Sequence, residues 1–347
     1  FIESILAHRY SLASIFFKDF SVPGPEELIT EDVIFFPRSL SDSEPSLILE
    51  FCSKIARHED DVILDASALQ FIDPLGLALL RATLESAEGK NFHVRWMAQH
   101  LIDYLIRMEF FDGLSVDGID VETARNPQGE PDRCVELVKV TDGQSEEIAS
   151  RLAVAMLGSA NDRSEEEMDS YRRPIEYALK ELLENALSHA RKEGNLRACV
   201  WVACQHFQTN GDVRLAIVDN GCGFLATLRG HAQLKERTDA AAIRAALIAR
   251  VSCNRGPLVG YEDDSQNQGV GLTTTARIAD AADGFLVIAS GNACLNTKTD
   301  DAVIFEEAFW KGVAISFHCN RDKLPQITIA ALLPEVEGAV DDDISFD

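Results

Sequence analysis

The chain has 347 residues, of which 46% are hydrophobic, and its formal net charge is −25. This composition supports a sizeable core, which excludes a globally disordered chain, and the length suits two domains. The negative charge, with no local basic patch to offset it, argues against nucleic acid and membrane surfaces as partners. No apolar run approaches the roughly 20 residues that a membrane-spanning helix needs.

Two features predict a cytoplasmic protein. The first residues, Phe1-Ile2-Glu3-Ser4, lack the basic region and cleavage site of a signal peptide. The eight cysteines form no Cys-x-x-Cys pair and no zinc-finger spacing, which favours free, buried thiols in a reducing compartment. Cys199 and Cys204 fall in a predicted strand, where their odd separation should point them to opposite faces.

The region before residue 122 alternates between strand and helix patterns, which predicts an α/β domain. The predicted strands are 62–64, 71–72 and 92–97, and the predicted helices are 75–87 and 101–108. Leu75, Leu79 and Ala82 form the apolar stripe of the first helix. Residues 122–133 contain two prolines, one glycine and no large apolar residue, so we expect a linker there.

The region after the linker favours an α+β sandwich, a mixed or antiparallel sheet backed by helices, because several strands follow one another late in the chain. The predicted helices are 145–157, 166–191, 239–250 and 272–282. The predicted strands are 134–140, 198–207, 213–218, 285–290, 313–319 and 327–332. Residues 334–347 form an acidic tail, which we expect to be frayed.

The predicted helix 166–191 carries a polar row on which Tyr177, Glu181, Asn185 and His189 are spaced by four residues. An Asn oxygen can ligate Mg²⁺, a hard cation, and a Glu one turn earlier can orient or deprotonate an attacking group. An ordinary amphipathic helix with a solvated face would show the same spacing. Taken alone, the helix favours that ordinary interpretation.

Two glycine motifs follow. A strand runs into Asp219, which can accept a hydrogen bond from an exocyclic amine, and Gly221 and Gly223 allow the backbone to approach a flat ring. A tight Asn-Gly turn explains this motif equally well. Gly269-Val270-Gly271 leads into the helix that carries Leu272 and Thr273, and free amides at a helix start bind phosphate. A flexible hinge is the simpler explanation of that pair alone.

The order and spacing of the three motifs together resemble the GHKL ATPase superfamily, which includes gyrase B, Hsp90, histidine kinases, MutL and the anti-sigma-factor serine kinases. The resemblance covers 134–333 and implies a Bergerat-type sandwich that binds ATP and Mg²⁺. It implies that Asn185 ligates Mg²⁺, that Glu181 is the general base and that 225–268 form a lid over the nucleotide. The implied nucleotide-binding residues are Asn185, His189, Asp219, Gly221, Gly223, Gly269, Val270, Gly271, Leu272 and Thr273.

One position departs from this superfamily. Its members often carry Gly-Thr at the start of the late strand, where the Thr helps to hold the adenine. This sequence has Gly312-Val313, and Ser316 is too far along the strand to substitute with confidence.

Residues 62–77 resemble the STAS domains of anti-anti-sigma factors, a likeness that covers 25–115 and assigns 1–121 to a STAS-like domain. The motif is a buried strand ending at Asp65, a short strand ending at Asp73, and Gly76 at a helix start. The family's phosphorylated serine lies just before that glycine, where this chain has Leu75 after Pro74. We therefore expect a docking or regulatory module, with simple packing on the ATPase domain as the alternative.

The combined resemblances predict a bacterial Mg-ATP-binding regulatory protein, leaning towards an ATPase, in which ATP binding and hydrolysis switch the lid and the contacts with protein partners. STAS or sigma-factor-like proteins are the expected partners, and a homodimer is left open. The alternative is a serine kinase that acts on a separate STAS protein. A histidine kinase is disfavoured because His8, His58, His93 and His100 lie in no dimerisation helix pair.

Overall fold

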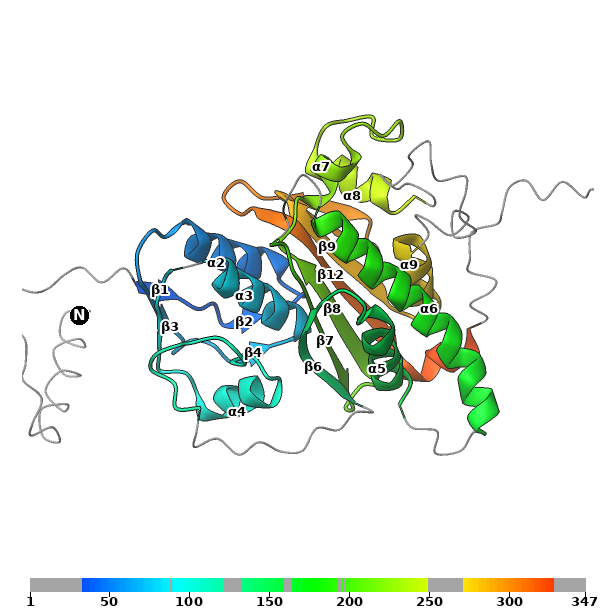
Figure 1. Ribbon diagram of the computed structural model, residues 1–347, viewed down its shortest axis with the longest axis horizontal. Helices are drawn as coiled ribbons and strands as arrows, with labels where there is room; N and C mark the ends of the chain where they lie inside the picture. The colour runs from blue at the N-terminus through cyan, green and yellow to red at the C-terminus, as the bar shows by residue number, and fades with distance from the viewer. Residues whose placement is uncertain are drawn as a thin grey trace, which may run out of the picture. The chain divides into compact units, whose positions relative to one another are not determined.

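A computed structural model gives the structure of residues 33–87, 89–121, 133–158, 164–191, 195, 197–248 and 271–327. These residues all belong to one unit by their contacts and form a mixed α/β fold (Figure 1). Residues 122–132 of the predicted linker, Gly269, Val270, the acidic tail and nearly all of the strand predicted at 327–332 lie outside the described residues. Among the described helices, none is long and apolar enough to cross a membrane.

The N-terminal region, residues 33–121, contains a small parallel sheet and three helices. The sheet has the order β1-β3-β5, and a separate parallel pair joins β2 to β4. Asp73 and Pro74 start α3, because the Asp73 carboxylate accepts the Gly76 N–H at 3.0 Å and proline suits the first helical turn. The elements are β1 (Val33–Phe35), β2 (Ser39–Leu40), α2 (Pro45–Arg57), β3 (Val62–Asp65), β4 (Phe71–Ile72), α3 (Pro74–Ser86), β5 (Phe92–Arg95) and α4 (Gln99–Arg107).

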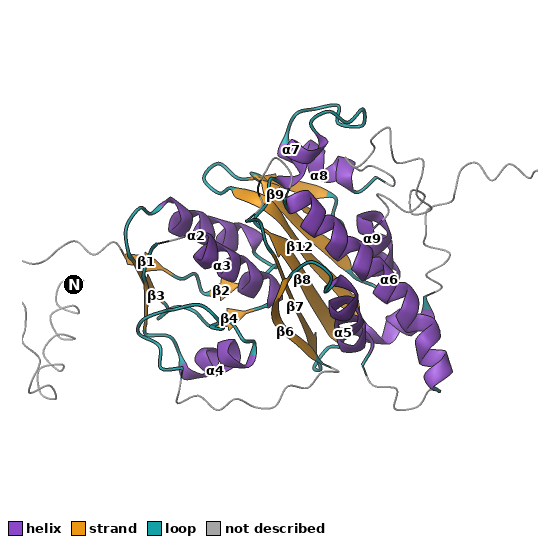
Figure 2. Ribbon diagram, in the orientation of Figure 1, coloured by secondary structure: helices purple, strands orange, loops and turns teal. Residues whose placement is uncertain are grey.

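The C-terminal region, residues 133–327, is built on a seven-stranded sheet in the order β11-β10-β9-β12-β8-β7-β6, in which every neighbouring pair is antiparallel. Helices back this sheet as predicted (Figure 2), and its described strands are antiparallel, which corrects the expectation of a mixed sheet. The strands are β6 (Cys134–Val140), β7 (Val200–Phe207), β8 (Asp212–Asp219), β9 (Phe285–Gly291), β10 (Ala293–Asn296), β11 (Asp301–Ile304) and β12 (Trp310–Asn320).

Helices cover both faces of this sheet. One face packs against α5, α6 and α9, and the other packs against α3 of the N-terminal region, which in turn packs against α2 (Figure 1). Cys199 and Cys204 lie in the two different cores, which confirms that they point to opposite faces. The remaining helices are α5 (Ser145–Leu157), α6 (Glu165–Ala190), α7 (Gly223–Leu228), α8 (Asp239–Ala246), α9 (Gly271–Ala281) and the 3-10 helix η5 (Arg321–Gln326).

Helix α3 differs from its predicted pattern. The stripe of Leu75, Leu79 and Ala82 predicts one apolar face, but all residues from 74 to 84 are buried. The reason is that α3 packs against α2 on one side and against β7 and β8 on another. Even Arg81 is buried, with its guanidinium 4.6 Å from the centre of the Trp201 ring. The N-terminal region and the large sheet therefore share one hydrophobic core.

A cluster of charged residues lies inside this shared interface. Arg214 on β8 approaches Asp73 at 3.1 Å and Asp42 at 3.3 Å, and its Nε donates to Asp212 at 2.9 Å. His318 on β12 contacts Asp42 through Nε2. Asp42 and Asp73 are almost fully buried, so each negative charge must be offset by these partners. The cluster ties the N-terminal region to two central strands of the sheet.

The charge of His318 should make stability depend on pH. Burial opposes protonation, but hydrogen bonds to Asp212 and Asp42 and the charges of both carboxylates outweigh it and raise the pKa of His318 to about 9. A pKa raised in the folded state stabilises the protein fully below the unfolded value of about 6.5 and loses this effect as pH rises towards 9. Denaturant unfolding of the wild type and His318→Gln should show the wild type losing about 3 kcal/mol relative to the variant between pH 6 and pH 9. Parallel profiles of the two proteins would contradict a protonated His318.

Candidate functional site

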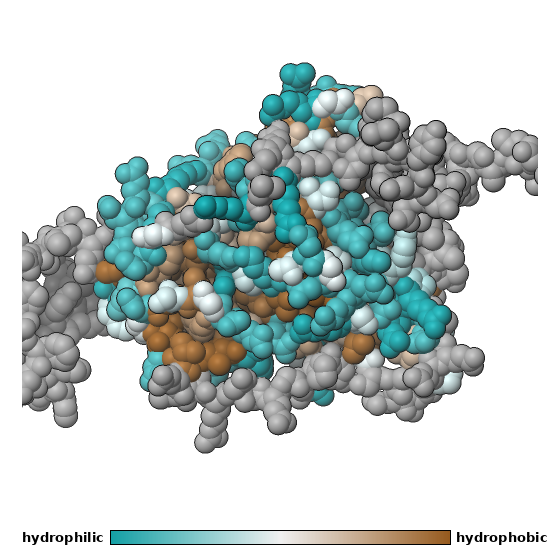
Figure 3. Space-filling view, in the orientation of Figure 1, coloured by the Kyte–Doolittle hydropathy of each residue, from teal (hydrophilic) through white to brown (hydrophobic). Residues whose placement is uncertain are grey.

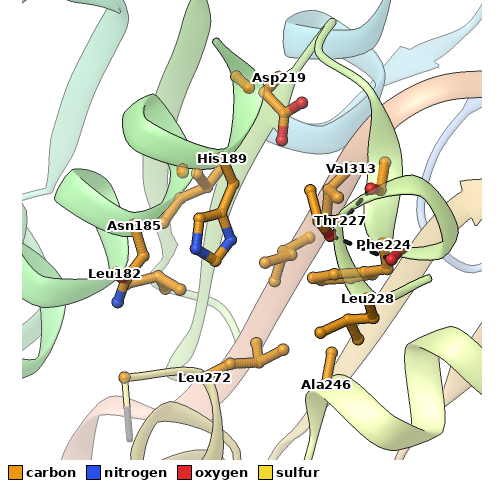
Figure 4. Close-up of a pocket in the computed structure, with 16 residues that line it drawn as sticks. Leu182, Asn185, His189, Asp219, Phe224, Thr227, Leu228, Ala246, Leu272 and Val313 are labelled. Atoms are coloured by element: carbon orange, nitrogen blue, oxygen red, sulfur yellow. Dashed lines mark hydrogen bonds between the residues drawn. The ribbon is translucent and has the colours of Figure 1, made fainter. Parts of the chain in front are cut away.

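A cavity lies between α6 and the end of the large sheet. The empty space there is about 780 Å³, a figure that includes the part open to solvent. Figure 4 shows Asn185 and His189 entering from α6, Asp219 at the other end, and Leu272 below them. Asn185, Asp219 and Gly271, one residue from each sequence motif, therefore line a single cavity.

Helix α6 supplies one wall of the cavity. Ser164 starts the helix by accepting the Glu167 N–H at 3.2 Å, and Leu179 and Leu183 bury its apolar stripe. The neighbouring face presents Leu182, Asn185, Ala186 and His189 to the cavity. Glu181 is half-buried and is not among the lining residues, although its backbone lies next to Gly271.

Asp219 is the most unusual group in the cavity wall. It ends β8 with 5% of its surface exposed, and its carboxylate accepts N–H groups from Gly221, at 2.8 Å, and from Val313. Burial raises the pKa of Asp219 to about 7 in spite of these two hydrogen bonds. A buried carboxylate that faces a cavity and keeps acceptor capacity suits a ligand with an N–H donor.

Glycines allow the chain to approach Asp219 closely. A Cβ on Gly312 would lie 2.0 Å from the Asp219 carbonyl oxygen, so only glycine fits where β12 passes β8. Gly223 has a φ of +77°, as its predicted positive φ requires, and it lines the cavity. Gly221 does not line the cavity, and the prediction that it faces a ligand is not supported by its position. Its Cβ would meet Ala190 at 2.3 Å, so this glycine serves contact with the end of α6.

The start of α9 forms the opposite end of the cavity. Gly271 and Leu272 line it, and a Cβ on Gly271 would come within 3.4 Å of the Asn185 side-chain nitrogen. Thr273 does not line the cavity, because its hydroxyl donates to the Leu247 carbonyl at 3.0 Å. The predicted residues Gly269 and Val270 lie outside the described residues.

An apolar wall completes the cavity, and the sequence motifs did not assign it. Phe224, Thr227 and Leu228 of α7 and Ala246 of α8 lie across from α6 (Figure 4). These residues fall next to or inside the predicted lid at 225–268, of which only 225–248 are described. In the described part, non-helical residues 229–238 join α7 to α8, and α8 packs against β9 and β10. Phe224, an aromatic residue directly after Gly223, is the sequence feature that could have indicated this wall.

Strand β12, which has Gly312-Val313 in place of Gly-Thr, offers the cavity no hydroxyl at position 313. Val313 lines the cavity and gives Asp219 a backbone N–H, but its side chain offers no hydroxyl. Ser316 points to the other face of the sheet, where its hydroxyl donates to Asp42. Ser316 is therefore no substitute for a cavity hydroxyl.

The residues of the cavity suit a metal only together with a ligand. Among the residues that the structure describes, no group of three or more His, Cys, Asp or Glu side chains could hold a metal ion. Asn185 offers one amide oxygen, and Mg²⁺ commonly takes few protein ligands and completes its shell with water and phosphate oxygens. Comparisons with family models, curated proteins and solved structures found no match.

The buried state of Asp219 generates a test. Because its folded pKa of about 7 lies above the ordinary value of 3.8, the free energy of unfolding should fall as pH rises from 4 to 7. Asp219→Asn keeps the shape but cannot ionise, so its stability relative to the wild type should increase by roughly 2–4 kcal/mol between pH 4 and pH 8. Denaturant unfolding of both proteins measures this, and a constant difference across the range would show that Asp219 has an ordinary pKa.

Proposed function

We propose that this protein binds Mg-ATP in the cavity and that its C-terminal region is a GHKL-type sandwich. One observation carries the proposal: Asn185, Asp219 and Gly271, which lie far apart in the sequence, line the same cavity. A solvated helix face, a turn and a hinge would each explain one motif alone, but these explanations give no reason for the three motifs to meet at one cavity. Helices α6 and α9, packed on one face of the sheet, support the sandwich part of this proposal.

The cavity divides into a base end and a phosphate end. At the base end, the Asp219 carboxylate would accept the adenine amino group, while Ile217, Phe224 and Val313 offer apolar contact to the ring. At the phosphate end, the amides at the start of α9 would bind phosphate oxygens. Asn185, next to Gly271, would hold Mg²⁺, which supplies charge neutralisation to the phosphates when it is bound.

We propose Glu181 as the residue that accepts a proton from the attacking group. It stands one helical turn before Asn185 and its backbone is adjacent to Gly271, which brings it to the phosphate end. With water as the attacking group the product is free phosphate, which makes the protein an ATPase. With a serine hydroxyl of a separate STAS protein, the same geometry would make it a kinase.

The N-terminal region is proposed as a STAS-like regulatory module. A parallel sheet with helices α2, α3 and α4 supports this. Leu75, at the position where a phospho-acceptor serine would stand, has no hydroxyl and is 2% exposed. This region is therefore proposed as a regulator and not as a phosphorylation substrate at that position. ATP would act on partners through its different affinity for two states of the protein.

Two substitutions on α6 should separate binding from turnover. Asn185→Ala removes the proposed Mg²⁺ ligand and should weaken Mg-ATP binding at least about tenfold. Glu181→Gln should bind Mg-ATP within about threefold of the wild type but lose about 100-fold or more in phosphate release. Calorimetric titration and a phosphate-release assay measure the two effects.

Glu184→Gln is the matched control, because Glu184 is exposed on the same helix and does not line the cavity. It should match the wild type in both assays. Turnover by Glu181→Gln at the wild-type rate would remove Glu181 from the proposed role. Transfer of labelled phosphate from ATP to an added STAS protein, in place of free phosphate, would decide for the kinase.

A further inference from the structure

The N-terminal region makes hydrogen bonds to the chain segments on either side of Asp219. Helix α2 provides the first contact through Ser53, which is only 5% exposed. The Ser53 hydroxyl accepts the Phe309 N–H at 3.0 Å and donates to the Phe309 carbonyl at 3.3 Å. Arg57, one turn further along α2, donates to the Glu307 carbonyl. Helix α2 thus holds the segment that leads into β12.

That segment supplies the groups that hold Asp219. Trp310, directly after Phe309, donates its indole N–H to the Asp219 carbonyl at 3.0 Å. Gly312 packs against Asp219, and the Val313 N–H reaches the carboxylate. Trp310 is buried in the core that the N-terminal region shares with the sheet. A shift of Phe309 would therefore move Trp310 and Val313 of β12, which contact the carbonyl and the carboxylate of Asp219.

Helix α3 provides a second contact, on the other side of Asp219. Its last residue, Ser86, accepts the Asn220 side-chain N–H at 2.9 Å. The same Asn220 side chain accepts the Cys199 N–H at 2.8 Å, so it joins the turn after β8 to the residue before β7. Asn220 lies between Asp219 and Gly221, whose N–H binds the carboxylate. Helices of the N-terminal region therefore make hydrogen bonds to two segments next to Asp219, the segment before β12 and the turn after β8.

We propose that the N-terminal region positions the base-binding end of the cavity, with Ser53 and Ser86 as its positioning residues; this inference rests on the proposed function. A serine in the buried part of α2 needs a hydrogen-bond partner, and it finds both in the backbone of Phe309. The phosphate end is built by α6 and α9, which lie on the opposite face of the sheet (Figure 1). The inference therefore concerns recognition of the base, and the phosphate contacts should be independent of it.

The test compares two nucleotides that differ at the base. Inosine triphosphate has the same phosphates as ATP but lacks the exocyclic amino group that would donate a hydrogen bond to Asp219. The ratio of its Kd to the Kd of ATP therefore measures the contact between the base and Asp219. In the full chain with Mg²⁺, Ser53→Ala/Ser86→Ala should weaken ATP binding about tenfold and inosine triphosphate binding less than about threefold. Ser86→Ala alone, which changes an exposed residue, should lower the ratio of the Kd of inosine triphosphate to the Kd of ATP by about twofold to threefold.

Thr83→Val is the control, because Thr83 is a buried hydroxyl of α3 that donates within its own helix to Leu79. It should leave the ratio unchanged even if it lowers the melting temperature. A wild-type preference for ATP that survives in the double variant, or falls equally in Thr83→Val, would overturn the positioning role and leave the proposed function intact. Absence of ATP binding by the wild type, or equal binding of both nucleotides, would overturn the proposed function as well.

Discussion

The burial of one carboxylate, that of Asp219, organises the end of the sheet where the cavity lies. Removing this charge from water is costly, and two backbone N–H groups offset only part of the cost, which is why its pKa rises to about 7. The surrounding chain meets the constraint with Gly312, where a side chain would collide with Asp219, and with the indole of Trp310 on its carbonyl. A group kept at such a cost, facing a cavity, is expected to serve a ligand.

The two covered faces of the large sheet carry different features. The face under α5, α6 and α9 holds the cavity, and the face under α2 and α3 holds the charged cluster of Asp42, Asp73, Arg214 and His318. Strand β8 joins them, because it carries Arg214 on one face and ends at Asp219 beside the cavity. Because the cluster is buried and charged, it specifies the position of the N-terminal region on the sheet more narrowly than apolar packing alone would.

Local patterns predicted much of the fold and the central part of the site. The helix at 145–157 and the strand at 134–140 have their predicted bounds, and Asn185, Asp219 and Gly271 meet at one cavity. Helix α2 was not predicted although Ile48, Cys52 and Ile55 have helical spacing after Pro45. The hairpin of β10 and β11 and the full burial of α3 were not predicted because long-range packing decides them. Ser53, Trp310 and Arg214 likewise gained their importance from partners far away in the chain, which periodicity and motif spacing do not encode.

Calorimetric titration of the full wild-type chain with ATP tests the central claim most directly. Our account predicts saturable binding at one site per chain in the presence of Mg²⁺ and weaker binding when the metal is chelated. It also predicts binding of GTP at least about tenfold weaker, because guanine has no amino group at the position that faces Asp219 in the adenine complex. No heat of binding with ATP at millimolar concentration, with or without Mg²⁺, would contradict the assignment of the cavity to a nucleotide.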